Sequence, residues 1–301
     1  MFRLLAAAAL TAVLATGATA AIADEISVDT ATGPVTVPHA PEKIAVFDIG
    51  ILDTLDAIGV APDGVVNRIY VTYLEDIVEQ AEPVGTLFEP DVEALHAMQP
   101  DLIIVGTRTS TKVDMLQKIA PTIDMSIWGD NYLEQTTGRL AAVGGIFDKE
   151  EEADALRSEL ETLVAETREV VDGKGTALII MTNGPKISAY GKNSRFGWLH
   201  SDLGIPPAKE DIENSRHGEV VSFEYVHEIN PDWLIVIDRA AAIGQDGEHA
   251  KQTLENALIS NTSAWKNDHV IYLDPAKAYV AMGGVQATTD LVKTIRDAFA
   301  Q

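Results

Sequence analysis

The chain has 301 residues, 46% hydrophobic and 23% charged, which is enough length and apolar content for two folded domains of ordinary size. Its formal net charge is −24, with 22 Lys and Arg against 46 Asp and Glu, and no run of basic residues occurs. Nucleic acid and anionic membrane surfaces repel such a chain, so neither is expected as a partner.

The first 23 residues have the pattern of a secretory signal peptide. Arg3 supplies the positive charge, residues 4–16 form an apolar stretch too short to span a bilayer, and small residues follow up to the expected cleavage site after Ala23. The chain contains no cysteine, which excludes disulfides, thiolate metal sites and a lipid-anchored cysteine. Export without an anchor favours a free protein in the bacterial periplasm.

Strands and helices alternate in the part of the chain that follows. Residues 26–37 have the pattern of a hairpin with its turn at Gly33. Two apolar runs of strand length, residues 44–47 and 101–106, are separated by segments that include a helical pattern over residues 51–58. This alternation predicts an α/β domain with a parallel, doubly wound sheet.

A long helix is predicted over residues 148–172 and divides the chain. Asp148 followed by Glu151 resembles a capping box, and Gly173 suits a helix C-terminus. The strand and helix alternation then restarts in apolar segments at residues 177–181, 198–203, 233–237 and 270–273. We therefore expect an N-terminal lobe over residues 24–147, a connecting helix over 148–172 and a C-terminal lobe over 173–301.

An internal repeat supports two similar lobes. Residues 93–108 align without gaps to residues 224–239, a constant offset of 131, and Glu, His, Pro, Asp, Ile, Val and Arg match in place. A repeat of this length indicates that each lobe contains the same helix–strand unit.

Two arginines end this repeat, Arg108 and Arg239, each just past an apolar strand. Ligands of open α/β sheets bind outside the carboxyl ends of the strands, so two facing lobes would present one arginine each to a shared cleft. The alternative for Arg239 is a surface ion pair, for example with Asp238. Arg195, in a glycine-bounded polar loop, is a third candidate, because guanidinium groups suit ligands rich in anionic oxygen.

His217 and Tyr279 are candidate ligands of ferric iron, because neutral imidazole and phenolate both bind it well. The alternatives are a loop histidine bonded to backbone and a half-buried aromatic residue in a loop after a strand. No motif of paired histidines occurs, so a metal cage made entirely of protein groups is not expected.

Glu93 and Glu224 occupy equivalent positions at the start of the repeated helix. They are either charges favoured by the helix dipole or one docking point per lobe for a two-lobed partner. No nucleophile, phosphate-loop or dinucleotide motif follows a strand, so the chain is not expected to be an enzyme and no catalytic residue or cofactor is assigned.

Four segments together resemble the periplasmic substrate-binding proteins of iron–siderophore ABC transporters, with the greatest similarity to binders of ferric catecholates. They are residues 194–198, 216–225, 230–240 and 271–275, and the resemblance extends over nearly the whole mature chain.

The resemblance implies two Rossmann-like lobes with parallel sheets, joined by a single long α-helix. It also implies that Arg108, Arg195 and Arg239 bind the ferric siderophore, and that His217 and Tyr279 coordinate iron directly when the siderophore supplies only four donors. Glu93 and Glu224 would dock on an ABC transporter permease in the inner membrane, and a monomer suffices for capture and delivery. Haem, a corrinoid or a ferric hydroxamate in the same fold are the alternative ligands.

Overall fold

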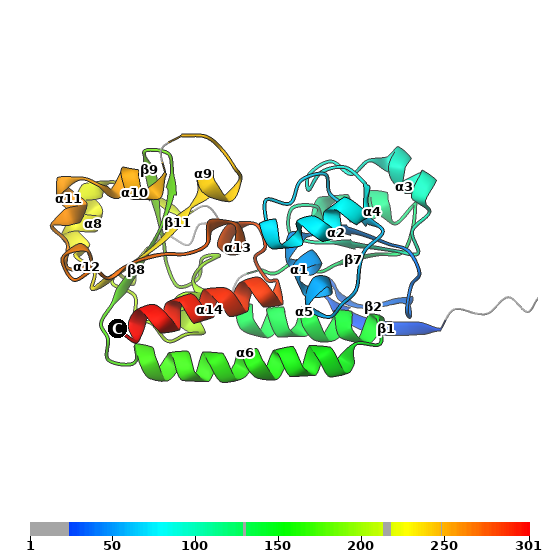
Figure 1. Ribbon diagram of the computed structural model, residues 1–301, viewed down its shortest axis with the longest axis horizontal. Coiled ribbons are helices and arrows are strands. Elements are labelled where there is room, and N and C mark those ends of the chain that lie inside the picture. Colours follow the sequence, from blue (N-terminus) through cyan, green and yellow to red (C-terminus); the bar gives the residue numbers. More distant parts are fainter. Residues whose placement is uncertain (1–23, 129–130, 213–217, 248) are drawn as a thin grey trace, which may run out of the picture.

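The computed structural model describes residues 24–128, 131–212, 218–247 and 249–301. The predicted signal peptide and His217 lie outside these residues. Two lobes stand side by side over a layer of long helices (Figure 1).

The first lobe contains a hairpin and a five-stranded parallel sheet. The hairpin pairs β1 (Glu25–Thr30) with β2 (Gly33–Pro38), and its two turn residues precede Gly33, which itself pairs with Thr30. The sheet has the order β5-β4-β3-β6-β7, formed by β3 (Ile44–Phe47), β4 (Gly64–Val65), β5 (Glu82–Pro83), β6 (Leu102–Val105) and β7 (Thr122–Asp124). Every pairing within it is parallel, as the sequence predicted.

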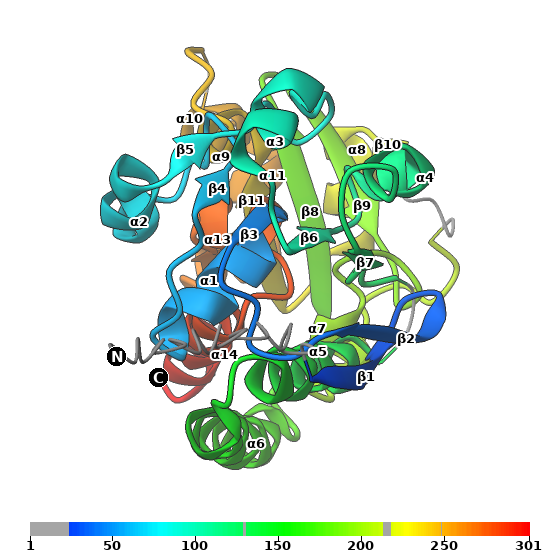
Figure 2. The same ribbon diagram turned by 90° about the vertical axis from the view of Figure 1, so that its right-hand side faces the viewer.

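The central strands of this sheet are buried on both faces, because helices cover it. These helices are α1 (Ile49–Ala57), the 3-10 turn η1 (Thr72–Leu74), α2 (Glu75–Gln80), α3 (Val92–Met98), η2 (Ser110–Lys112), α4 (Val113–Leu116) and α5 (Tyr132–Ile146). In the view of Figure 2 the first lobe lies in front of the second.

The second lobe has a mixed sheet of order β10-β9-β8-β11-β12. Its strands are β8 (Ala177–Asn183), β9 (Lys186–Tyr190), β10 (Glu219–Val221), β11 (Trp233–Asp238) and β12 (Val270–Tyr272). The expected parallel arrangement holds for β8, β11 and β12. β9 runs antiparallel to β8, because a tight connection joins the two strands, and β10 pairs antiparallel with β9.

Short helices surround this second sheet. They are α7 (Trp198–Ser201), α8 (Phe223–Ile229), α9 (Arg239–Ala242), α10 (Ala250–Leu254), α11 (Ala257–Ser260), α12 (Ser263–Lys266) and α13 (Pro275–Tyr279).

The long helix α6 (Glu150–Val171) connects the lobes, and its 22 residues give a length of about 33 Å. The predicted capping box is wrong, because Asp148 adopts φ +52° in the left-handed region and its carboxylate pairs with His39 at 3.0 Å. Lys149 occupies the N-cap position without a side-chain cap bond.

The last helix, α14 (Val285–Phe299), is a second link between the lobes that the sequence did not predict. It packs along α6 and against α1 of the first lobe (Figure 1). The buried carboxylate of Asp53 in α1 accepts hydrogen bonds from the backbone N–H groups of Gln286 (2.9 Å) and Ala287 (3.0 Å), at the N-terminus of α14.

The internal repeat corresponds to the same local structure in both lobes. Asp91 and Ser222 cap α3 and α8, each through a side-chain oxygen that accepts a backbone N–H three residues later. Both helices end at a left-handed residue, Gln99 and Asn230, which turns the chain into the Pro-Asp start of the next strand. Within the described residues, none of the helices combines the length and apolarity needed to cross a bilayer.

Candidate functional site

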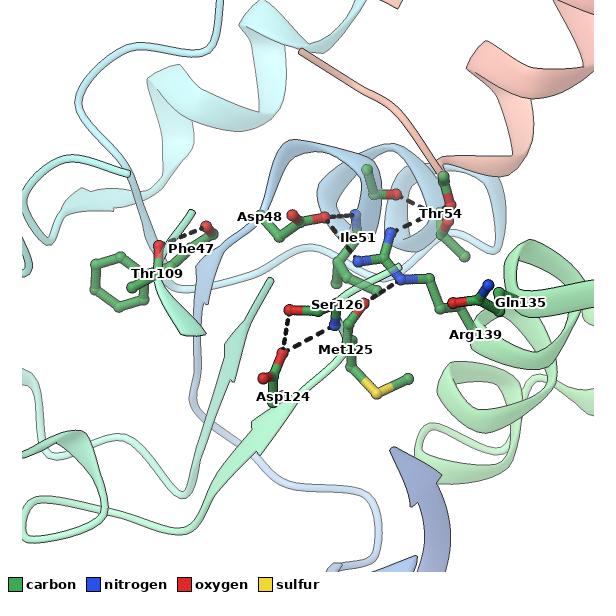
Figure 3. Close-up of polar contacts among 12 residues, drawn as sticks. Phe47, Asp48, Ile51, Thr54, Thr109, Asp124, Met125, Ser126, Gln135 and Arg139 are labelled. Carbon is green, nitrogen blue, oxygen red and sulfur yellow. Dashed lines mark hydrogen bonds and ion pairs between the residues drawn. The ribbon is translucent and has the colours of Figure 1, made fainter. Parts of the chain in front are cut away.

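Arg108 emerges from a tight turn at the carboxyl end of β6. The N–H of Thr109 bonds to Gly106 O at 2.9 Å and closes the turn. The Thr109 hydroxyl donates to Leu87 O at 2.6 Å, and it has Phe47 O within 3.3 Å (Figure 3). These contacts anchor the turn to two neighbouring segments. Arg108 is therefore held half-buried at the carboxyl ends of the strands of the first sheet.

A buried ion pair lies next to this turn, at the carboxyl ends of the strands. Asp48 caps α1 by accepting the N–H of Ile51, and its carboxylate lies 3.4 Å from the guanidinium of Arg139 on α5 (Figure 3). Arg139 also donates to Met125 O after β7. Gly106 has to be glycine here, because a Cβ would come within 2.0 Å of the Asp48 carboxylate. The carboxyl ends of β3, β6 and β7 are thus locked together.

Arg239 is the first residue of α9, directly after β11. Its Nε lies 3.3 Å from the hydroxyl of Tyr279, and its Nη1 donates to Asn183 Oδ1 at 3.2 Å. Asp238 instead caps α9 by accepting Ala241 N–H, and it also accepts the N–H of Ala250. Asp238 Oδ2 also lies 3.4 Å from His249 Nδ1. The alternative of an Arg239–Asp238 ion pair is wrong, because the partners of this carboxylate are the α9 cap, Ala250 N–H and His249.

Arg195 lies in the connection between β9 and α7, and its guanidinium lies close to two aromatic rings. Its guanidinium carbon lies 5.0 Å from the ring centre of Phe196 and 4.5 Å from that of Tyr279. Its Nη2 donates to Tyr279 O at 3.2 Å and contacts the Met282 sulfur at 3.7 Å. Its Nε is buried and has no hydrogen-bond partner in the described part of the chain.

All three predicted arginines converge on Tyr279. Arg108 donates to Tyr279 O at 2.8 Å across the junction between the lobes, and its guanidinium carbon lies 5.6 Å from the ring. The corresponding distance for Arg239 is 5.8 Å. Tyr279 was expected in a loop, but it ends the short helix α13, which Asp274 caps through Lys277 N–H.

The electrostatic environment of Tyr279 favours its ionised form. Burial by itself raises the pKa of the phenol, but the hydrogen bond from Arg239 and the charges of Arg195, Arg239 and Arg108 outweigh it and lower the pKa below its ordinary value. Burial, together with the nearby charge of Arg108, lowers the pKa of Arg195. The cluster is thus a concentration of positive charge around one phenol.

Three residues next to this cluster were not predicted from the sequence. Tyr190 is fully buried at the end of β9, where burial raises its pKa to about 12. Asn183 ends β8 and Met282 follows α13. Only Asn183 carried a usable signal, since it follows an apolar strand as Arg108 and Arg239 do.

Glu93 and Glu224 are both exposed, in the first turns of α3 and α8. The backbone N–H of Glu224 and the Ser222 side chain lower the pKa of Glu224. The two carboxylates therefore occupy equivalent surface positions, one per lobe. Metal-binding groups of three or more His, Asp or Glu side chains do not occur within the described residues, which exclude His217.

Two of the protein's cavities are relevant to the position of the site. One of about 620 Å³ lies between β1 and α5, within the first lobe, and none of the candidate residues lines it. Another of about 400 Å³ has walls from both lobes, including Ala241 of α9, the helix that Arg239 begins. None of Arg108, Arg195, Arg239 and Tyr279 lines this second cavity either, but unlike the first it lies at the junction between the lobes, where the three arginines meet.

Comparison with known proteins agrees with this arrangement. The periplasmic binding protein family model matches residues 44–277. The petrobactin-binding protein YclQ of Bacillus subtilis is 38% identical over 265 residues, covering 87% of this chain and 83% of that protein. The ferric-anguibactin-binding protein FatB of Vibrio anguillarum is 29% identical over 280 residues, covering 87% of this chain and 84% of that protein.

Solved structures show the same fold. The crystal structure of YclQ matches with a TM-score of 0.87 and 36% identity, covering 92% of this chain and 99% of that one. The periplasmic catecholate-siderophore binding protein VctP of Vibrio cholerae matches with a TM-score of 0.84 and 33% identity, covering 91% of this chain and all of that one (100%). The family match, the relatives and the two-lobed architecture lead to one conclusion: the chain belongs to the periplasmic binding protein family.

Proposed function

We propose that this protein is the periplasmic solute-binding component of an ABC importer and captures a ferric siderophore, of the catecholate class, between its two lobes. It is a binding protein and not an enzyme. Its relatives support this, because YclQ, FatB and VctP are each named for binding a siderophore or its ferric complex.

The observation that carries the proposal is the convergence of Arg108, Arg195 and Arg239 on one phenol, in a chain with a net charge of −24. Each guanidinium has five N–H donors, and the acceptors around them engage only a minority. An anionic ligand rich in oxygen would use the rest. Each charge pair at 4 Å contributes about 4 kcal/mol at an effective dielectric of about 20, before desolvation offsets much of it.

Iron coordination by the protein is a finer part of the proposal. Tyr279 would supply a phenolate, which its lowered pKa favours, and His217 would supply an imidazole nitrogen. Both would act only when the siderophore leaves coordination positions open. The iron is cargo, so the protein needs no resident cofactor.

Delivery would follow from the two exposed carboxylates, Glu93 and Glu224, docking on the permease, one from each lobe. The unit that does this is a monomer of residues 24–301, released in the periplasm after removal of residues 1–23. Its functional parts are the lobes 24–147 and 173–301 and the helix 148–172.

The test is intrinsic fluorescence of the mature protein, titrated with ferric complexes of hexadentate and tetradentate catecholates, a hydroxamate, citrate and haem. Trp198, stacked on Tyr132 at 4.8 Å, is one of the reporters. Catecholates should bind most tightly, and Arg108→Ala and Arg239→Ala should each weaken them. Arg157→Ala, an α6 residue paired with Asp154, is the matched control.

Unchanged catecholate affinity in both cleft variants would refute the proposed site, and binding of only the hydroxamate or haem would refute the ligand class. Protein ligation of iron predicts a preference for the tetradentate complex that His217→Ala and Tyr279→Phe each remove.

A further inference from the structure

The cavity of about 400 Å³ between the lobes has features that the arginine cluster does not explain. Its wall in the second lobe consists of two small residues, Ala241 and Gly244. Its wall in the first lobe is the segment before α2 and one face of α2 itself. No residue of the arginine cluster lines this cavity, but the two adjoin the same short helix, because Arg239 begins α9 and Ala241 of α9 forms part of the cavity wall.

Arg68 is a fourth arginine, exposed on this wall. Its guanidinium carbon lies 4.5 Å from the ring centre of Tyr70, an arrangement in which the ring holds the cation. Within the residues that the structure describes, no carboxylate lies within ion-pair distance of it. Its Nη2 faces Gly244, where an added Cβ would lie only 3.1 Å away. The N–H groups of Arg68 are thus available inside the cavity.

The segment that carries Arg68 is held firmly in place. Three of its side chains are buried, namely Val66, Ile69 and Val71. Asn67 N–H donates to Gly85 O at 2.7 Å, and Gly85 N–H donates to the Asn67 side chain at 3.2 Å. Tyr70 has φ +63°, a left-handed conformation that costs free energy for a residue other than glycine. In this conformation the Tyr70 ring lies against the guanidinium of Arg68.

The part of the same first-lobe wall that α2 forms is negative. Glu75 and Glu79 on α2 line it, both are exposed, and neither forms an ion pair with any residue of the described part of the chain. A purely anionic group would be attracted by Arg68 and repelled by α2. A group that carries both a negative and a positive charge matches Arg68 and α2 at the same time.

We propose that this cavity is a subsite for a zwitterionic arm of the siderophore, with a carboxylate on Arg68 and an ammonium group near Glu75 and Glu79. The inference rests on the proposed function, since the ferric centre of the same ligand would occupy the arginine cluster. It adds the chemistry of the ligand's periphery, which neither the relatives' names nor the cluster specifies.

The experiment compares ferric complexes of four 2,3-dihydroxybenzoyl ligands by fluorescence titration. The methylamide has no charged arm, the glycine conjugate has a carboxylate, the diaminobutane conjugate has an ammonium group, and the lysine conjugate has both. The lysine conjugate should bind most tightly, by about tenfold over the methylamide, as expected for added hydrogen bonds between charged groups.

Variants assign the preference to its residues. Arg68→Ala should remove the advantage of the lysine conjugate over the diaminobutane conjugate, and Glu75→Gln with Glu79→Gln should remove that of the lysine conjugate over the glycine conjugate. Ala241→Leu, which narrows the cavity from the second lobe, should reduce both advantages. Arg157→Ala should change neither.

Equal affinity of the unmodified protein for the methylamide and lysine complexes, or an unchanged preference in Arg68→Ala, would overturn the subsite and leave the proposed function standing. Failure of the unmodified protein to bind any of the four complexes would overturn both.

Discussion

Asp53 provides a direct test of how the last helix is attached to the first lobe. It is almost completely buried and accepts hydrogen bonds from Tyr73 and from the backbone of Gln286 and Ala287. Burial is the largest influence on this carboxyl group, and it raises the pKa of Asp53 from 3.8 to about 7 despite the three hydrogen bonds. Asp53→Asn removes the titration while keeping the shape of the side chain.

The sign follows from proton linkage. A carboxyl group with a higher pKa in the folded protein binds its proton more tightly there, so its stabilisation is complete below pH 3.8 and is lost as the pH rises through about 7. A pKa difference of about 3 corresponds to about 4 kcal/mol. Between about pH 4 and 8, the free energy of unfolding of the variant should therefore rise by about this amount relative to the unmodified protein.

The assay is urea unfolding followed by tryptophan fluorescence at pH values across this range. Asp76→Asn, on the exposed surface of α2, is the matched control and should show a constant difference from the unmodified protein. A constant difference for Asp53→Asn as well would refute the reasoning. It would mean that the N-terminus of α14 stabilises the carboxylate more than burial destabilises it.

Three further outcomes are expected. Spectrophotometric titration should detect one tyrosine that ionises below the usual range, and the step should vanish in Tyr279→Phe; its persistence would contradict the role of the arginines. Gly284→Ala puts a Cβ 2.4 Å from a buried carboxylate and should cost about 1–3 kcal/mol in thermal unfolding, whereas Gly138→Ala, with open space around it, should not destabilise. Arg139→Met should cost about 3–5 kcal/mol because it leaves a buried carboxylate unpaired, and a simultaneous Asp48→Asn should recover part of that loss; equal costs would contradict the ion pair.

Local patterns in the sequence predicted most of the secondary structure around the site. The strands β3, β6, β8 and β11 are short apolar runs, and their burial on both faces of a sheet makes such runs recognisable. The repeat was informative because its features are local. The helix cap, the helix, its left-handed end and the Pro-Asp start of the strand are all decided by residues close together in the chain.

One prediction failed because a distant contact overrides a local preference, and another failed because a local signal was not used. Asp148 has the sequence of a helix cap, but His39 from the other end of the lobe binds its carboxylate and the backbone turns left-handed. Tyr279 follows a strand as a loop residue would, yet Asp274 and Pro275 start a short helix that ends at the phenol. The contact with His39 leaves no mark in the segment around Asp148, whereas Asp followed by Pro is a local helix-start signal that the prediction of a loop did not use.

The sequence by itself determined that two similar α/β units flank a long helix, and that Arg108 and Arg239 follow equivalent strands, because periodicity and spacing are properties of the chain. Only the tertiary structure decided that these arginines and Arg195 share one phenol. Arg108 and Tyr279 are 171 residues apart and meet because α6 and α14 fold the lobes against each other. The same packing decided the attachment of α14 to Asp53 and the inter-lobe position of Arg68, since convergence depends on how rigid elements pack and not on any one segment's pattern.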